Sequence, residues 1–400
     1  MPSFLCIKLI FRVMSSTIFK TEFILICFSS LFFSASYNML ISELPSYLSE
    51  LGGAEYKGLI ISLFTLTAGV SRPFSGRLTD TIGRKPVIFI GAMVCIICGL
   101  LYPIMGTVLS FFVLRFFHGF STGFSPTGYA AYVSDISPKE RMGEAMGIQS
   151  IFFVTGLALG PALGSFIKLN SSYNLLFYSS VTMALLSIIH ILGIRETKSI
   201  SNSFKFKSLY LKPKDIFDIR VFKPAMVTFL VYMQFGVVLT IVPDWSDYLS
   251  IGNKGAFFIF FTLSSIIIRL FSGKLSDIHG RLKVLNWGLI LLAIAMSIIG
   301  FFHTAYGLFI GALIYGAAMG TLTPSLSAWT IDLSSPDAKG RAISTMFIAL
   351  EVGIGLGALV SGWYFHDEIK NIPIIFIWSA ILALFTIAYC AWLRNTLKSI

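Results

Sequence analysis

A series of long apolar runs constrains this chain more than any other feature. Twelve can be counted, each of roughly 20 residues, the length that crosses the ~30 Å hydrocarbon core of a bilayer as a helix. Lipid offers the backbone no hydrogen-bond partner, and the runs are too long and too uniformly apolar for barrel strands. The sequence therefore predicts an all-α integral membrane protein. The expected helices lie at about residues 22–45, 56–78, 86–105, 107–134, 144–167, 173–194, 222–244, 255–275, 283–302, 305–331, 341–364 and 372–393.

The basic residues predict how these helices are oriented. When the runs are threaded alternately from an inside N-terminus, 23 of the 30 Lys and Arg residues fall on one side and four on the other. Under the positive-inside rule, we expect an inner (cytoplasmic) membrane protein with both termini in the cytoplasm. The net charge of +11 then faces membrane lipids and requires no nucleic acid partner.

The chain also repeats itself at a fixed offset of 197 residues. Gly76 falls on Gly273 and Asp80 on Asp277, without a gap across some eighty residues. Six helices per half is an even number, so both halves should insert the same way up, related by an axis along the membrane normal. Further matching pairs are Gly83 and Gly280, Arg84 and Arg281, Gly119 and Gly316, Gly123 and Gly320, Asp135 and Asp332, Gly156 and Gly353, and Gly160 and Gly357.

Five segments are expected on this basis. Residues 1–21 are expected to form a cytoplasmic leader or to reflect a misplaced start, because no small-residue cleavage site marks them as a signal peptide. A linker rich in Lys and Ser, with a surface helix expected near residues 212–219, joins the two bundles. The N-terminal bundle is expected at 22–194, the linker at 195–221, the C-terminal bundle at 222–393 and a cytoplasmic tail at 394–400.

The segment Gly76-Arg-Leu-Thr-Asp80-Thr-Ile-Gly83-Arg84-Lys85 resembles the signature loop of the major facilitator superfamily. A weaker copy runs from Gly273 to Arg281, and the resemblance covers the whole chain. It implies twelve helices in two pseudo-symmetric bundles around a central cavity, a small-molecule substrate, alternating access, no cofactor and a monomeric protein. One departure is Thr81, where the family usually has Arg.

The loop suggests a gate. Gly76 and Gly83 would allow a tight reversal, and Asp80 would lie near the start of the third helix and cap its free N–H groups. Arg84 and Lys85 would reach Asp135. The resemblance implies that the loop latches the halves together on the cytoplasmic side; alternatively, its residues only make turns and follow the charge rule. The second copy offers Gly273, Asp277, Gly280, Arg281 and Asp332.

Three ionisable residues inside the expected helices are candidates for proton coupling, because a charge at that depth is costly and marks function by default. Arg115, in a pattern that resembles the superfamily's fourth-helix motif, could otherwise snorkel to the surface. Glu351 could bind and release a proton, pair with a buried cation, or be packed without a role. His118 could titrate or be hydrogen-bonded in a helix interface.

Arg72 and Arg269 occupy equivalent positions near the loops. They are expected to anchor helices at the interface or to attract an anionic substrate.

The fifth expected helix indicates the direction of transport. Its spacing resembles the antiporter motif of the superfamily's efflux branches and favours proton antiport over uptake. Its small residues and Pro161 would let the helix pack closely against its neighbour across the interface between the halves. Ordinary small-residue helix packing is the alternative. The motif residues are Gly147, Gly156, Gly160, Pro161 and Gly164.

The resemblance implies a central substrate cavity between helices one, four, seven and ten. Its mixed aromatic and polar lining would suit an amphipathic molecule. The candidate lining residues, besides Arg115, are Tyr37, Asn38, Tyr129, Gln234, Tyr315 and Trp329.

Other classes lack the motifs they need. The five histidines are scattered, and neither Gly-x-Ser-x-Gly, HExxH nor a phosphate loop is present, so neither an enzyme, a metal site nor ATP-driven transport is expected. A passive or signalling membrane protein remains open.

Overall fold

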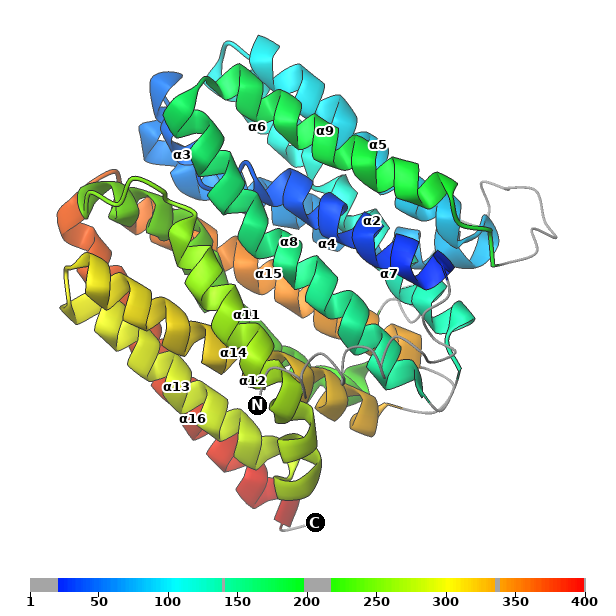
Figure 1. The fold of residues 1–400 in the computed structure, drawn as a ribbon. Helices are drawn as coiled ribbons and strands as arrows, with labels where there is room; N and C mark the ends of the chain where they lie inside the picture. Colours follow the sequence, from blue (N-terminus) through cyan, green and yellow to red (C-terminus); the bar gives the residue numbers. More distant parts are fainter. Residues whose placement is uncertain (1–20, 139–140, 198–216, 335–338, 399–400) are drawn as a thin grey trace, which may run out of the picture.

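The computed structural model describes residues 21–138, 141–197, 217–334 and 339–398, and every regular element in these ranges is a helix. Figure 1 shows two bundles side by side. The N-terminal half, blue to green, contains α2 (Thr21–Asn38), α3 (Leu44–Glu50), α4 (Lys57–Thr81), α5 (Arg84–Leu101), α6 (Val108–His118), α7 (Phe120–Ile136), α8 (Met142–Asn170) and α9 (Tyr173–Leu192). The C-terminal half, light green to red, contains α11 (Phe222–Tyr248), α12 (Ala256–His279), α13 (Arg281–Phe301), α14 (Ala305–Leu333), α15 (Lys339–Phe365) and α16 (Ile372–Lys398).

In the described ranges, twelve helical segments run from one end of the bundles to the other, with α6 and α7 counted as one. Among the described residues, nine helices are long and apolar enough to span a membrane. The other three crossings are more polar or are interrupted: α2 carries four serines, α4 carries basic residues, and α6 and α7 form one crossing with a break at Gly119. The expected all-α membrane fold is confirmed.

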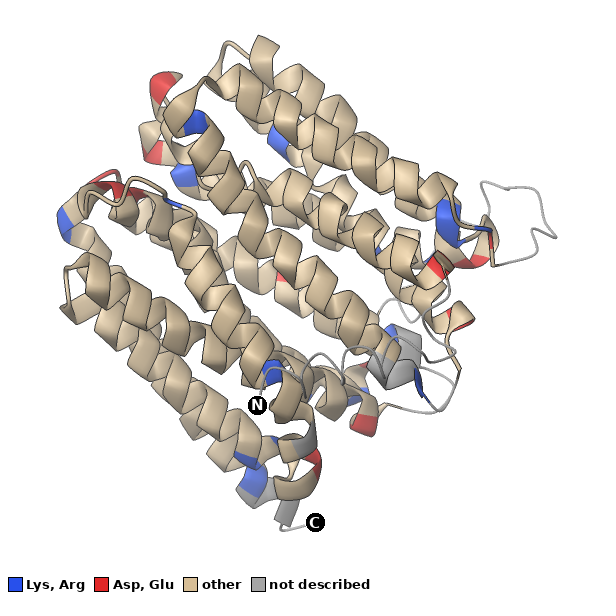
Figure 2. Ribbon diagram, in the orientation of Figure 1, with Lys and Arg blue, Asp and Glu red and all other residues tan. Residues whose placement is uncertain are grey.

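Charges lie mainly at the two ends of the bundles, and the middle of the helices carries few (Figure 2). Large apolar side chains such as Leu109, Ile189 and Trp378 are exposed along the outer helix faces, which is the pattern of a surface solvated by lipid. One end carries Arg84 and Arg281 and is called the Arg84 end below. The opposite end carries Lys57 and Lys254 and is called the lysine end.

The first crossing ends earlier than the apolar run suggests. The expectation of one helix to about residue 45 is wrong, because α2 ends at Asn38 and a separate helix, α3, begins at Leu44. Pro45 occupies the first turn of α3, where its missing N–H costs no hydrogen bond. The expected linker helix near residues 212–219 and the leader lie almost wholly outside the described residues.

The signature loop is shorter than expected. Gly76 and Asp80 lie inside α4, which continues to Thr81, so the expectation that Gly76 takes part in the reversal is wrong. A glycine in a helix costs only ~1 kcal/mol and does not by itself stop it. The reversal occurs at Gly83, whose φ of 104° favours glycine, and the copy reverses at Gly280 with φ 86°.

The cap of α5 is also different from the expected one. Asp80 belongs to the last turn of the preceding helix, so it does not start α5. The backbone N–H groups of Arg84 and Lys85 instead donate to the two carboxylate oxygens of Glu196 at 3.0 and 2.9 Å. The segment that follows α9 thereby caps α5 and stabilises the loop within the N-terminal half.

The glycines of the antiporter-like helix pack within their own half. A Cβ at Gly156 or Gly160 would collide with the backbone of α2, and one at Gly164 with the backbone of Met39, directly after α2. Gly353 and Gly357 of α15 meet the backbone of α11 in the same way. The expectation that these glycines pack across the interface between the halves is wrong. Other positions of α8 do face the other half: Gly255 lies against the backbone at Pro161 and Ala162, and Arg269 donates to the Ser150 hydroxyl.

Candidate functional site

The main contact between the halves is a close, antiparallel packing of α4 against α15. At the lysine end, Gly58 approaches Gly362 and Ala358 so closely that a Cβ on Gly58 would lie 2.5 Å from the Ala358 carbonyl oxygen. Further along, the Ser62 hydroxyl donates to the carbonyl of Gly355 at 2.8 Å. Small residues at helical spacing therefore let the two backbones meet from the lysine end inward.

This contact ends on an ion pair between the two halves. Arg72 of α4 donates from Nη2 and Nε to the same oxygen, Oε1, of Glu351 on α15, at 2.6 and 3.1 Å. Its guanidinium also lies 4.7 Å from the centre of the Phe347 ring. Both partners are shielded: the Arg72 side chain is 11% exposed and the Glu351 side chain 7%.

The ion pair answers two questions that the sequence left open, one about Glu351 and one about Arg72. Glu351 pairs with a buried cation, and Arg72 does not act as an interfacial anchor, because its guanidinium faces the other half. Breaking a buried ion pair by removing one partner typically costs ~3–5 kcal/mol. The pair therefore links the two halves by both charge and hydrogen bonds.

A second set of ion pairs joins the halves at the lysine end. Lys57 of the N-terminal half lies 2.5 Å from carboxylate oxygens of both Asp244 and Asp367 in the C-terminal half. Lys254, 197 positions later, lies 2.6 Å from Asp247 in its own half and 3.9 Å from Glu43 in the other. We call these six residues the lysine lock.

Lys254 also crosses the interface by a hydrogen bond. Its ammonium donates to the Ser46 hydroxyl at 2.7 Å, and its backbone N–H donates to the Ser165 hydroxyl at 3.0 Å. Each half thus contributes a lysine that contacts the other half, and these contacts close the lysine end.

The contacts at the Arg84 end lie within each half. Arg84 is 2.8 Å from Asp135 and 3.3 Å from Asp80. Arg281 pairs with Asp332 at 2.8 Å and with Asp277. Since these pairs join residues of one half, the predicted latch between the halves stays a prediction. Lys85 donates to the carbonyls of Leu192 and Ile194.

Arg115 is buried inside the N-terminal half, with 1% of its surface exposed, so the snorkelling alternative is wrong. Its Nε donates to the carbonyl of Ile60 at 2.9 Å, and its guanidinium lies 4.4 Å from the centre of the Phe64 ring. His118 is fully buried, with Nδ1 3.3 Å from the Tyr102 hydroxyl. The coupling roles of Arg115 and His118 stay predictions.

The residues expected to line the cavity are all buried in this conformation. Tyr37 stacks on Phe64, and Asn38 donates to the carbonyl of Ser34. The Tyr129 hydroxyl lies inside the N-terminal half, 2.9 Å from Ser29 and 3.0 Å from Ser187.

The remaining three lining candidates belong to the C-terminal half. Both amide atoms of Gln234 and the Tyr315 hydroxyl have no hydrogen-bond partner among the described residues. Trp329 packs in the hydrophobic core. The structure thus brings the expected lining into two separate bundles, and its substrate role stays a prediction.

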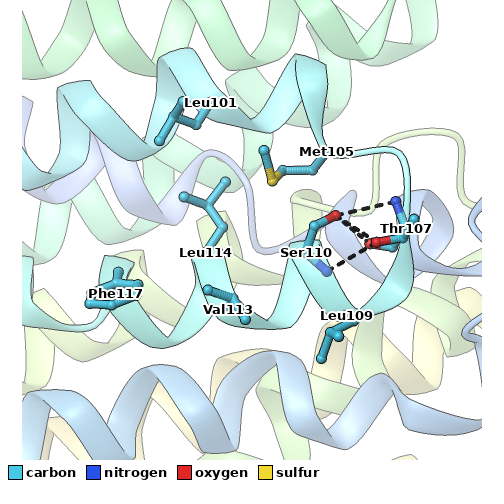
Figure 3. A pocket seen from close by; sticks show the side chains of 8 residues that line it. All are labelled: Leu101, Met105, Thr107, Leu109, Ser110, Val113, Leu114 and Phe117. Carbon is cyan, nitrogen blue, oxygen red and sulfur yellow. Dashed lines mark hydrogen bonds between the residues drawn. The ribbon is translucent and has the colours of Figure 1, made fainter.

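A hollow of about 480 Å³ lies between the end of α5 and α6, away from the ion pairs (Figure 3). Its two polar residues, Thr107 and Ser110, hydrogen-bond to each other as the cap of α6. The rest of the lining is apolar, and Leu109 and Phe117 are exposed on the outer helix face. Such a surface suits lipid chains, and the hollow is separate from the interface between the halves.

Comparison with known families agrees with this architecture. A model of the Major Facilitator Superfamily matches residues 26–225 and again residues 224–399. The chain belongs to the major facilitator superfamily. It is a multi-pass membrane transporter and has no enzymatic role.

Curated relatives are similar to this chain over most of its length, and solved structures share its fold. The Multidrug resistance protein MdtG of Escherichia fergusonii is 25% identical over 382 residues, covering 91% of each chain. The Quinolone resistance protein NorA of Staphylococcus aureus is 21% identical, covering 83% of this chain and 87% of that protein. Among solved structures, the nucleoside transporter NupG aligns with a TM-score of 0.77 at 14% identity, covering 92% of this chain and 99% of that one. The D-xylose-proton symporter aligns at 0.72 with 18% identity, covering 93% and 97%.

Sequence reasoning missed three contacts that shape the site. Arg72 and Glu351 were each noticed, but not as partners. Lys57 and Lys254 could have been found, because the repeat offset relates them and they belong to the few lysines outside the basic side. Glu196 gave no signal, since the start of a linker rarely suggests a helix cap.

Proposed function

We propose that this transporter exports a small amphipathic molecule across the inner membrane in exchange for protons, with the Arg84 end and both termini in the cytoplasm. The named drug-resistance relatives and the spacing of the antiporter-like helix support export. An uptake symporter for a sugar or another small metabolite is the alternative, and the fold shared with a D-xylose-proton symporter favours it.

The observation that carries the proposal is the Arg72–Glu351 ion pair between the halves. In the conformation described, the lysine end is closed and the carboxylate lies against the guanidinium. Opening the lysine end separates α4 from α15 and moves Arg72 away from Glu351. Because a neighbouring cation changes how readily a carboxylate binds a proton, proton binding and release can follow the opening and closing of the transporter.

The lysine lock would act in the same cycle. It is ~22 Å of helical rise away from Arg72, at 1.5 Å per residue. The lock would hold the outer end closed while the cavity faces the cytoplasm, and it would open when substrate is released outside.

The proposal is tested by flux in sealed vesicles. Full-length protein is reconstituted, a pH gradient is imposed, and a panel of amphipathic fluorescent dyes of either charge is followed. Glu351→Gln and Arg72→Gln should lose gradient-driven flux, while Glu351→Gln retains exchange of dye for dye, which requires no net proton movement. Lys370→Gln, which removes an exposed ion pair with Glu368, is the control.

The result that would overturn the proposal is gradient-driven flux at the native rate in Glu351→Gln. The direction of the gradient separates the two candidate functions. Export requires dye and protons to move in opposite directions, and the uptake alternative requires them to move together.

A further inference from the structure

The interior of the transporter has an unbalanced charge. Away from the helix ends, the crossing helices of the described chain carry three cations, Arg72, Arg115 and Arg269, and one anion, Glu351. Glu351 neutralises Arg72. Two positive charges remain, and a charge at this depth is costly unless it is paired or used.

The repeat shows that Arg269, rather than Arg115, is the arginine whose counterpart has an acidic partner. The offset of 197 residues relates Arg72 to Arg269, Phe347 to Ser150, and Glu351 to Val154. In the first copy, Arg72 lies over the Phe347 ring and pairs with Glu351. In the second copy, Nη1 of Arg269 donates to the Ser150 hydroxyl at 2.9 Å, and the position of the acid is occupied by valine.

The same cross-half contact is therefore built twice, and only one copy contains a carboxylate. Arg269 has no carboxylate within 4.0 Å among the described residues, and its Nε is buried without a hydrogen-bond partner there. An arginine guanidinium binds a planar carboxylate by donating two parallel N–H hydrogen bonds to its oxygens. The arrangement is complementary to a carboxylate supplied from elsewhere.

The surroundings are also suited to an oxyanion. Ser150 of α8 and Arg269 of α12 face each other across the interface between the halves. Tyr232 of α11 shares a hydrogen bond with Thr323 of α14, with 3.2 Å between the two hydroxyl oxygens. The contact across the interface thus places one hydroxyl, that of Ser150, beside the Arg269 guanidinium.

We propose that Arg269 binds the carboxylate of an amphipathic substrate, so that the transported molecules are organic anions or zwitterions. Ser150 orients the guanidinium, and Val154 leaves the guanidinium free for the substrate by not supplying an acid. The substrate thus completes, in the second copy, the ion pair that Glu351 makes in the first. The inference rests on the proposed transport function but not on its proton coupling.

The test is a binding measurement without any gradient. Purified full-length protein in detergent is dialysed to equilibrium against coumarin-3-carboxylate and, separately, coumarin-3-carboxamide, which share a ring system and differ in charge. The quantity compared is the ratio of the two affinities within each variant, which does not depend on the fraction of folded protein. The native protein should bind the carboxylate about tenfold more tightly or better, as expected for a charge-assisted bond.

Two variants make the guanidinium of Arg269 unavailable to the substrate in different ways. Arg269→Gln deletes it, and Val154→Glu keeps it but supplies the acid found in the first copy. Both should bring the ratio close to one, whereas Arg269→Lys should keep part of the preference. Lys370→Gln, which changes the net charge equally at an exposed position, should keep the native ratio.

Three results would overturn the inference. They are a native ratio of one or less, a native ratio retained in Arg269→Gln, or a native ratio retained in Val154→Glu. Because dialysis involves no proton gradient, these results are independent of whether Glu351→Gln loses gradient-driven flux. Failure of the substrate class and failure of the proton coupling are therefore distinguishable.

Discussion

Lys57→Met should open the lysine end. The substitution retains most of the apolar stem and removes the ammonium, which lies 2.5 Å from oxygens of both Asp244 and Asp367 in the other half. Lys57 is 5% exposed, so water can solvate the carboxylates in place of the missing ammonium only if the halves separate. The variant would leave two neighbouring carboxylates without their shared cation.

The magnitude follows from how deeply each partner is buried. Removing one partner of a buried ion pair costs ~3–5 kcal/mol, whereas exposed pairs contribute ~0–1 kcal/mol. The Asp244 side chain is largely buried, but that of Asp367 is 43% exposed, so solvent screens its share. We expect the closed form to lose ~2–3 kcal/mol, a ~30- to 150-fold fall in the ratio of closed to open protein.

Spin labels can measure this ratio. Leu109 and Tyr306 are related by the repeat offset, lie at the lysine end of their halves, and are 73% and 82% exposed. Labels on cysteines at these two positions, in a background without other cysteines, report the distance between the halves by double electron–electron resonance. Lys57→Met should add a longer distance to the native distribution. Lys370→Met, which loses an exposed ion pair at the same end, should not.

A distance distribution in folded Lys57→Met identical to that of the native protein would refute the reasoning. The lysine lock would then be a by-product of closure, and the glycine contacts of α4 with α15 would hold this end alone.

Three further predictions follow from individual contacts. Gly58→Leu places side-chain atoms against the Ala358 carbonyl, so the same labels should show the longer distance and dye flux should fall about tenfold or more; native flux would contradict this. Tyr129→Phe removes a buried hydroxyl from its bonds to Ser29 and Ser187 and should lower the free energy of unfolding by ~1 kcal/mol, measured by denaturation in detergent. Asp80→Asn should weaken the predicted latch and increase labelling of a reporter cysteine in the cytoplasmic cavity; unchanged labelling would argue that Asp80 serves only its own half.

The sequence by itself determined the elements and their repetition. Hydropathy depends on local composition, so the apolar runs predicted the crossings, and a fixed offset of 197 residues predicted two equivalent halves. The conformation of the loop glycines could not be predicted from the sequence. Gly83 and Gly280 adopt positive φ and reverse the chain, whereas Gly76 and Gly273 stay in their helices, because glycine permits a turn without requiring one.

Only the tertiary structure decided which charges meet. Arg72 and Glu351 are 279 positions apart, and Arg84 receives its backbone cap from Glu196, 112 positions away. The sequence places four charges in the crossing helices away from the helix ends but does not state which helix faces which. Helix packing brings Arg72 to Glu351 and Arg269 to Ser150. The two arginines are related by the repeat, but the position that corresponds to Glu351 is occupied by Val154. A buried charge acquires its role from the neighbour that replaces water around it, and that neighbour comes from another helix.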